Sequence, residues 1–462
     1  MSGDLKLGPH VALLPSSGMG HLTPFIRLAA SLTALGVQVT FITPHPTLSL
    51  AESESLSHFF STFAQITRKH LHLLPLDNPS VNTEDPFYYH FEVIRRSSHL
   101  LSPILSSLSP PVSALITDMS LASTVIPITD ALRLPNYVLF TSSAKMSILY
   151  LSFHTMVGTK ASGDSNLMKD VQISSLEPIA RSWIPPPLLH DDDNLLKSYF
   201  IENGKKMTES SGILINTYES IEHESLAVLS DGKVVKKLPP VFAIGPLPPC
   251  NFQKGQSLAW LDDQPAGSVL YISFGSRTAM SREQIRELGD GLVRSDTGFL
   301  WVVKDKKVDV EDDSELIEVL GHGLMERIQG RGLVVKNWLN QEEVLSHRAI
   351  GGFLSHCGWN SVNEAIWHGV PMLSWPQHGD QKINADLVER IGLGMWVENW
   401  GWGGDEPVVK GEEIAERIKE LMGNQLLRSR ATLVREEARM AVRADGSSYK
   451  KFIDLIETWK TF

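Results

Sequence analysis

Short apolar runs alternate with longer segments of helical periodicity through the first half of the chain. Residues 11–14, 37–43 and 114–117 are apolar runs of the length expected for buried strands. Between the first two runs, residues 22–35 place apolar side chains three or four positions apart, which predicts an amphipathic helix. Strands that alternate with helices form βαβ units, so this pattern predicts a parallel sheet with right-handed crossovers.

The same alternation restarts after a proline-rich segment. Five prolines fall between residues 239 and 249, and polar residues follow, so residues 246–256 form the predicted linker. The later runs predict a second α/β domain, with strands at 269–274, 299–303, 332–335, 350–354 and 370–375 and a helix at 281–294. We therefore expect one domain over residues 1–245, another over 257–445, and an amphipathic terminal helix over 446–462.

The bulk composition narrows the class of protein. A chain of 462 residues, 42% hydrophobic and 21% charged, suits two globular domains. Residues 1–9 lack signal-peptide features and no apolar run approaches the ~20 residues of a membrane span, so we expect a cytoplasmic protein. Two cysteines, Cys250 and Cys357, cannot build a disulfide framework or a four-thiolate zinc site. A formal charge of −11 argues against a nucleic-acid partner, so local features must hold any anionic ligand.

A polar loop follows the first predicted strand and contains a candidate general base. Residues 16–21 read Ser-Ser-Gly-Met-Gly-His, and the two glycines allow unusual backbone angles. Thr23 stands where a GxGxxG dinucleotide fingerprint needs its third glycine, so the loop departs from that fingerprint; a nicotinamide-dependent dehydrogenase is a further alternative. His21 has two interpretations: a helix-start histidine that hydrogen-bonds locally, or a general base, because neutral imidazole accepts a proton at cytosolic pH.

Asp118 is the candidate partner of that histidine. It ends the apolar run 114–117, and ligands of α/β sheets gather beyond the carboxyl ends of the strands. A carboxylate there can orient a basic imidazole, although a strand-end turn or a helix cap is the alternative. A His21–Asp118 pair is therefore a hypothesis of the sequence.

A second polar corner lies within residues 338–381. An apolar run leads into Ser-His-Cys-Gly-Trp-Asn-Ser over 355–361, after which a helix is predicted. The N–H groups and the dipole of a helix start form an anion site, and Gly358 allows the backbone to approach. The side-chain donors at this corner are His356, Asn360 and Ser361. The corner can thus bind a phosphate without a lysine cluster; a capped helix without a ligand is the alternative.

Four more residues of this segment suit the other parts of a nucleotide sugar. Glu364 can accept from a ribose hydroxyl, although Ser361-x-x-Glu364 also fits a helix capping box. Trp338 is suited to stack on a base, and Asp380 and Gln381 to hold sugar hydroxyls. Core or surface roles are the alternative for each residue taken alone.

Residues 338–381 together resemble the 44-residue signature of plant family-one UDP-sugar glycosyltransferases. The Gly-His loop, a Phe-Gly-Ser element at 274–276, the late linker and the terminal helix agree with that family. The resemblance implies the GT-B fold: two Rossmann-like domains that face a cleft, with the acceptor held by the first, the UDP-sugar by the second, and the terminal helix packed back on the first. It implies an inverting reaction with UDP-glucose as co-substrate and no metal or other cofactor, and we expect a monomer.

The resemblance also assigns a role to each signature position. Trp338 stacks on uracil with Gln341 beside it, and Glu364 binds ribose. The phosphate-binding set is Ser276, His356, Asn360 and Ser361, with Gly358 at the backbone, and the sugar-binding set is Trp359, Asp380 and Gln381. The final glutamine is similar to that of glucose-using members. Thr141 and Ser142 resemble residues near the sugar and the leaving phosphate.

Within the family, the chain looks most like the flavonoid C-glucosyltransferases. Asp85 and Phe87 belong to an Asp-Pro-Phe element similar to theirs and are the candidate acceptor-binding residues, although Asp-Pro is also an ordinary turn pair. Asp118 is followed by an apolar residue as in those enzymes, and residues 44–51 and 91–96 are also similar.

The implied function is C-glucosylation of a 2-hydroxyflavanone or a phloretin-like trihydroxyphenyl ketone in plant secondary metabolism. If His21 deprotonates a phenol, negative charge spreads onto the ortho carbon, which can attack the anomeric centre. A shift of about 1 Å in the acceptor decides between carbon and oxygen. The alternatives are an O-glucosyltransferase that acts on a phenol or hormone, and a nucleotide-sugar-binding protein without turnover.

Overall fold

The chain folds into two units, each built on one parallel sheet. Unit 1 contains Met1–Phe252 and Met440–Phe462, and unit 2 contains Gln253–Arg439. The computed structural model describes residues 8–75, 86–158, 177–189, 194–232, 234–235, 237–250, 259–275, 279–304, 315–336 and 339–461. The first boundary falls inside the predicted linker. The chain returns to unit 1 at Met440, a few residues before the predicted start of the terminal helix.

The sheet of unit 1 has seven strands among the described residues, in the order β3-β2-β1-β4-β5-β6-β7. The strands are β1 (His10–Leu14), β2 (Gln38–His45), β3 (Thr67–His72), β4 (Ala114–Asp118), β5 (Asn136–Phe140), β6 (Gly212–Ile215) and β7 (Val241–Ala243). All neighbours are parallel. The order reverses at β1, which has β2 on one side and β4 on the other, so the space between β1 and β4 is the topological switch point.

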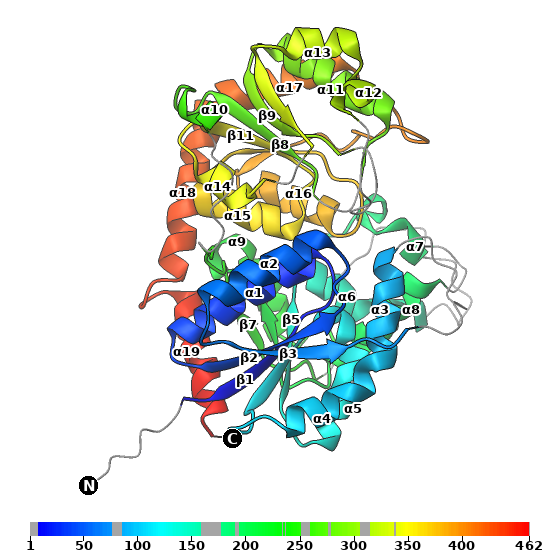
Figure 1. Ribbon diagram of the computed structural model, residues 1–462, viewed down its shortest axis with the longest axis vertical. Coiled ribbons are helices and arrows are strands. Elements are labelled where there is room, and N and C mark those ends of the chain that lie inside the picture. Colours follow the sequence, from blue (N-terminus) through cyan, green and yellow to red (C-terminus); the bar gives the residue numbers. More distant parts are fainter. Residues whose placement is uncertain are drawn as a thin grey trace. The chain divides into compact units, whose positions relative to one another are not determined.

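Helices cover both faces of this sheet (Figure 1). They are α1 (Met19–Ala34), α2 (Leu50–Thr62), α3 (Pro86–Ser97), α4 (Leu101–Ser106), α5 (Ala122–Ala131), α6 (Ala144–Gly158), α7 (Pro186–Leu189), α8 (Leu195–Met207), α9 (Glu219–Ser230) and α19 (Ser447–Trp459). Val11 and Leu13 pack with α1, α2 and α19, whereas Ala12 and Leu14 pack with α3, α4 and α5. This alternation explains the unbroken apolar run, because a strand buried on both faces has no polar side.

The terminal helix α19 supplies part of the core of unit 1. Its residues Phe452, Leu455, Ile456 and Trp459 belong to the same apolar cluster as β1 and α1. Trp459 is fully buried, and its ring meets that of Tyr137 on β5 edge to face, 5.7 Å between centroids. The apolar face that the helical periodicity of the last residues predicts thus packs against the sheet of unit 1.

The sheet of unit 2 has six parallel strands among the described residues, in the order β10-β9-β8-β11-β12-β13. They are β8 (Val269–Ser273), β9 (Gly298–Val302), β10 (Gly332–Val335), β11 (Ile350–Ser355), β12 (Met372–Ser374) and β13 (Gly394–Trp396). Here the order reverses between β8 and β11, so the space between these two strands is the switch point of unit 2.

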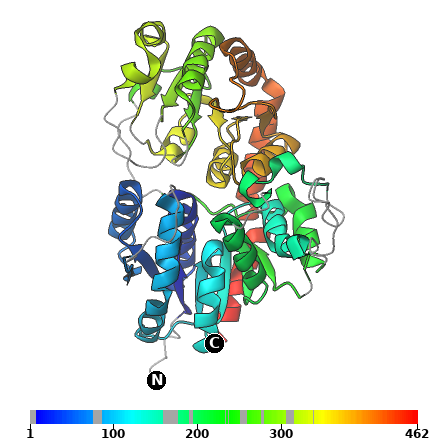
Figure 2. The ribbon, with the colours of Figure 1, turned by 90° about the vertical axis from the view of Figure 1, so that its right-hand side faces the viewer.

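The helices of unit 2 also flank their sheet, as the turned view shows (Figure 2). They are α10 (Ala259–Asp262), α11 (Arg282–Ser295), α12 (Leu316–Leu320), α13 (His322–Ile328), α14 (Gln341–Ser346), α15 (Trp359–His368), α16 (Gln381–Arg390), α17 (Gly411–Gly423) and α18 (Gln425–Ala441). The predicted strands and the predicted α/β class are confirmed in both units.

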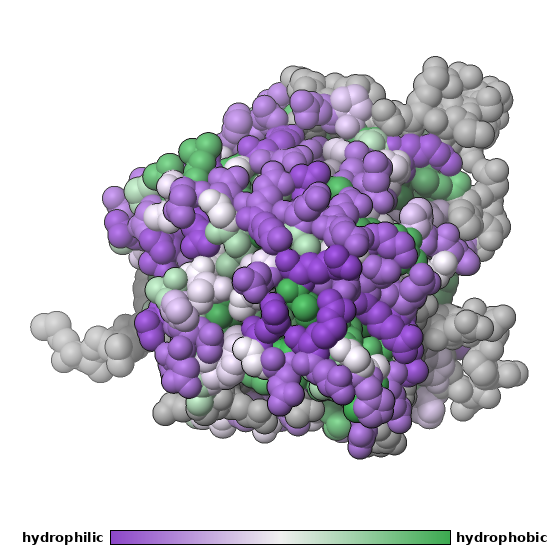
Figure 3. Space-filling view, turned by 90° about the horizontal axis from the view of Figure 1, so that it is seen from above, coloured by the Kyte–Doolittle hydropathy of each residue, from purple (hydrophilic) through white to green (hydrophobic). Residues whose placement is uncertain are grey.

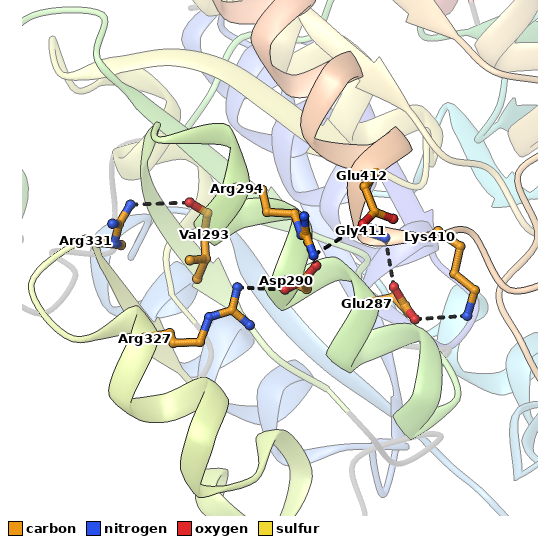
Figure 4. Close-up of polar contacts among 9 residues, drawn as sticks. All are labelled: Glu287, Asp290, Val293, Arg294, Arg327, Arg331, Lys410, Gly411 and Glu412. Atoms are coloured by element: carbon orange, nitrogen blue, oxygen red, sulfur yellow. Dashed lines mark hydrogen bonds and ion pairs between the residues drawn. The ribbon is translucent and has the colours of Figure 1, made fainter.

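Ion pairs link α11 to α13 and α17 on the surface of unit 2 (Figure 4). Asp290 accepts from Arg294 and, at 2.7 Å, from Arg327, while Glu287 accepts from Lys410 Nζ at 3.0 Å and from the Gly411 amide at 2.8 Å. The face of the molecule shown in Figure 3 is mostly hydrophilic, with small scattered groups of hydrophobic residues. No helix in the described part of the chain is both long and apolar enough to cross a membrane.

Candidate active site

His21 and Asp118 follow the two strands that flank the switch point of unit 1. The β1–β4 register pairs Leu14 with Thr117, so both polar segments leave the sheet at the same edge. There His21 Nδ1 lies 2.9 Å from Asp118 Oδ2, a contact between residues 97 positions apart. The hypothesis of a His21–Asp118 pair, made from strand ends alone, matches this geometry.

The two oxygens of Asp118 have different partners. Oδ1 accepts from the Ser120 amide at 2.9 Å and from its hydroxyl at 2.5 Å, which caps the short 3-10 helix Met119–Leu121. Oδ2 faces His21. The sequence left two roles open for Asp118, a helix cap and a carboxylate that orients His21. This one fully buried side chain makes both contacts.

This arrangement selects one tautomer of the His21 ring. A carboxylate accepts, so Nδ1 carries the proton and Nε2 is the basic nitrogen of the neutral ring. The side chain of His21 keeps 19% of its surface exposed, while that of Asp118 has none. The Thr141 hydroxyl lies 3.2 Å from His21 Nδ1, and the Phe91 ring meets the imidazole edge to face at 5.9 Å. The pair thus has the geometry of an oriented general base.

The loop before His21 is held by a residue that the sequence analysis did not single out. Gly18 has φ 92°, a conformation that favours glycine, and α1 begins directly after it, three residues earlier than predicted. The buried Glu52 carboxylate accepts from the Gly18 amide and, at 2.7 and 3.1 Å, from the Leu48 and Ser49 amides. The spacing Ser49-x-x-Glu52 signals a capping box, which α2 has, but not the contact with Gly18.

A second unpredicted carboxylate holds the segment after β5. Thr141 and Ser142 are both more than nine-tenths buried at the carboxyl end of that strand. The Ala144 and Lys145 amides, at the start of α6, donate to Glu222 at 2.9 and 3.0 Å. A buried carboxylate thus satisfies the open helix start, and no local sequence pattern links it to residues 78 positions away.

His356 follows β11 at the switch point of unit 2, and two glycines lie against its ring. Ser355 pairs with Ser273 of β8, so the turn after β8 lies beside the turn after β11. A Cβ added to Gly275 or to Gly358 would stand 2.7 Å from His356 Nε2, so only glycine leaves room for this ring. The ring is half-buried, and it forms a hydrogen bond with the Ser273 backbone.

His356 is neutral at physiological pH. Its pKa is lowered to about 4, mainly by burial and in addition by the nearby His378, while a hydrogen bond with the Ser273 backbone opposes both effects. An anion bound at this turn would therefore be stabilised by the helix dipole and by backbone N–H groups, not by a charge on His356.

Gln341, Ser361 and Glu364 form a connected polar group. Gln341 Nε2 donates to Ser361 Oγ at 2.9 Å and to Glu364 Oε2 at 2.6 Å. The helix α15 has Gly358 as its N-cap, so Ser361 lies inside the first turn and does not cap it. The capping-box alternative is therefore wrong, because α15 begins before Ser361, and the three polar residues make side-chain contacts with one another instead.

Asp380 and Gln381 are fixed at the start of α16. Gln381 Oε1 accepts from the Gln377 and His378 amides at 2.8 and 3.1 Å, which orients its side chain within this turn. Asn384 Nδ2 donates both to Asp380 Oδ2 at 2.9 Å and to the Cys357 carbonyl at 3.0 Å. Asn384, which the sequence did not indicate, thus joins this turn to the turn between β11 and α15.

The remaining candidates are placed as follows. Trp359 is only 3% exposed, so its indole packs inside unit 2 at the first position of α15, and Asn360 follows it, half-buried. Asp85, Ser276 and Trp338 lie outside the described residues. Phe87 lies in the first turn of α3, and only its backbone is described.

Comparison with known families accounts for both units. The family model described as "Glycosyltransferase, N-terminal domain" matches residues 10–249, and that described as "UDP-glucoronosyl and UDP-glucosyl transferase" matches residues 239–401. The chain belongs to the plant family-one UDP-glycosyltransferases, and it is a UDP-glycosyltransferase by class.

Particular relatives span nearly the whole chain. UDP-glycosyltransferase 708G2 from Citrus unshiu is 54% identical, with 99% of this chain and 98% of the relative covered. UDP-glycosyltransferase CGT from Oryza sativa subsp. japonica is 45% identical, with 96% and 95% covered. The crystal structure of LpCGTa in complex with UDP is 47% identical and superposes with a TM-score of 0.86, with 98% and 99% covered. The fold is therefore GT-B, as the resemblance implied.

The low pKa of His356 predicts an acid-sensitive unit 2. The unfolded chain protonates this histidine near pH 6.5 and the folded chain near pH 4, so folding loses stability as the pH falls through that window. We expect the loss to be on the order of 2 kcal/mol, measured as the free energy of unfolding in urea at pH 7 and pH 4.5. His356→Gln should reduce the pH dependence, whereas His99→Gln, at an exposed site, should keep it. Equal pH dependence in both variants would contradict the assignment.

Proposed function

We propose that this enzyme transfers glucose from UDP-glucose to a carbon atom of a flavonoid-type polyphenol, with inversion at the anomeric carbon. The proposal rests first on the 2.9 Å contact between His21 Nδ1 and the fully buried Asp118. The choice of carbon over oxygen is supported by the relatives whose names contain CGT, the abbreviation of C-glucosyltransferase. The acceptor class is a 2-hydroxyflavanone or a phloretin-like trihydroxyphenyl ketone.

His21 removes the phenolic proton of the acceptor in the proposed reaction. The proton passes to Nε2, because Nδ1 already donates to Asp118. The imidazolium formed in this way is stabilised by the buried carboxylate, which also prevents the ring from turning. Ser120 holds the Asp118 oxygen that faces away from His21, and the Thr141 hydroxyl lies 3.2 Å from the His21 Nδ1 that faces Asp118.

The bond changes balance without a further reactant. The phenolate delocalises its charge onto the ortho carbon, which forms a bond to the anomeric carbon while the bond to the UDP oxygen breaks. UDP leaves with the bonding electrons, the ring carbon then loses its proton and regains aromaticity, and the His21 imidazolium returns the first proton to the phenolate oxygen. The products are the β-C-glucoside, UDP and one proton released to solvent, so the bond changes consume no further reactant and no redox equivalent.

The donor is assigned to unit 2. The Gly275–His356–Gly358 corner and the start of α15 would receive the phosphates through backbone N–H groups, Asn360 and Ser361. The Gln341–Glu364 group would receive the ribose, and Asp380 and Gln381 the glucose. Trp338, Ser276, Asp85 and Phe87 keep the roles that the resemblance implies, and a cytoplasmic monomer remains part of this proposal.

Replacement of Asp118 tests the base. Asp118→Asn should lower kcat for phloretin glucosylation by about 10²–10⁴-fold, because the amide neither fixes the Nδ1–H tautomer nor stabilises the imidazolium. The measurement is UDP release at saturating UDP-glucose. Ser120→Ala is the matched control, because it removes a hydroxyl from Oδ1 and leaves Oδ2 facing His21. Equal rates for the two variants would overturn the role of Asp118.

The stability of the product tests the linkage. The glucoside formed from UDP-glucose and phloretin should survive both hot acid and a β-glucosidase, because neither cleaves a carbon–carbon bond. An O-glucoside of the same acceptor serves as the hydrolysis control. Release of the free aglycone from the enzymatic product would show an O-glucosyltransferase instead.

A further inference from the structure

Two adjacent residues of α3 contact the part of unit 1 that carries the base. His90 is hydrogen-bonded to Ser17, which lies in the loop between β1 and α1. Phe91 contacts the His21 imidazole edge to face, with 5.9 Å between ring centroids and an angle of 89°. Both side chains are more than nine-tenths buried. The helix α3 therefore contacts both the loop before His21 and the His21 ring.

The partners of His90 define its protonation state. Nε2 lies 3.2 Å from the Pro46 carbonyl, which can only accept, so Nε2 carries the proton. Nδ1 then accepts from the Ser17 hydroxyl. Burial lowers the pKa of His90, which keeps the ring neutral and its Nδ1 an acceptor. One imidazole thus connects α3 with the loops that follow β1 and β2.

Hydrogen bonds from two helices hold this loop. Ser17, Glu52 and His90 line a narrow pocket of about 10 Å³, which is room for about one water molecule. Glu52 ties the Gly18 amide from α2, and His90 ties Ser17 from α3. Loss of either side chain therefore removes a hydrogen bond that fixes the loop.

We propose that His90 is a positioning residue, which acts through Ser17 and Phe91 to set where His21 meets the acceptor. The inference rests on the proposed function, in which His21 is the base. A misplacement of about 1 Å can cost about 10²-fold in rate and can change which acceptor atom is in line. His90 thereby also sets the ratio of carbon to oxygen glucosylation.

Two substitutions at position 90 separate positioning from bulk. His90→Phe keeps a ring of similar size and removes both hydrogen bonds, whereas His90→Gln has an amide that can accept and donate. We expect His90→Phe to lower kcat with phloretin about 10–100-fold and to raise the O-glucoside fraction, with the KM for UDP-glucose changed less than twofold. His90→Gln should recover most of the lost rate. The control is His99→Phe at an exposed site, with wild-type kinetics expected.

An activity-independent measurement distinguishes the two proposals. In ¹⁵N-histidine-labelled protein without substrates, with the His21 signals assigned through His21→Gln, the imidazole resonances of His21 should shift in His90→Phe and in Ser17→Ala but not in His99→Phe. Unshifted His21 resonances, or wild-type kcat and product ratio in His90→Phe, would overturn the positioning role. If His90→Phe does not fold, Ser17→Ala carries the test. A wild-type enzyme that transfers no glucose to phenols would overturn the proposed function while leaving the resonance test intact.

Discussion

The hydrogen bond between His21 Nδ1 and Asp118 Oδ2 depends on two strands that are far apart in sequence but adjacent in the sheet. The β1–β4 pairing brings a loop and a strand end to one edge, and the carboxylate there is fully buried. A buried carboxylate is costly unless its oxygens are bonded, and Ser120 and His21 meet that requirement. The contacts that orient the His21 ring are therefore among those that make the burial of Asp118 tolerable.

Unit 2 has its candidate phosphate site at the switch point of its own parallel sheet, in a chain whose net charge is negative. The chain carries a formal charge of −11, and the ring at its anion corner is neutral because burial lowers the pKa of His356 to about 4. The β8–β11 switch point compensates with backbone N–H groups at the start of α15 and with glycines where a Cβ would collide with the ring. The proposed phosphate site therefore relies on directed dipoles rather than on net charge.

Much of this architecture follows from local patterns, and the rest depends on contacts that local patterns do not encode. Apolar runs gave the strands, and the rule that strand ends gather at one edge gave the His21–Asp118 pair. Glu52, Glu222 and Asn384 could not be found in that way, because each acts on backbone groups or loops brought close only by the tertiary fold. His90 is of the same kind, because its partners lie 73 and 44 positions away. The spacing Ser361-x-x-Glu364 misled for a related reason: the helix start, which decides whether a serine caps, was set earlier at Gly358.

The proposed mechanism depends on removal of the acceptor's proton by His21. The most direct measurement compares kcat/KM of the wild type and His21→Ala across phenolic acceptors whose own pKa values run from about 6 to about 10, at pH 7.5. The base interpretation predicts a large rate ratio for weakly acidic phenols that falls toward one for acceptors already ionised in solution. A ratio that stays constant across the series would contradict it and would assign His21 to binding alone.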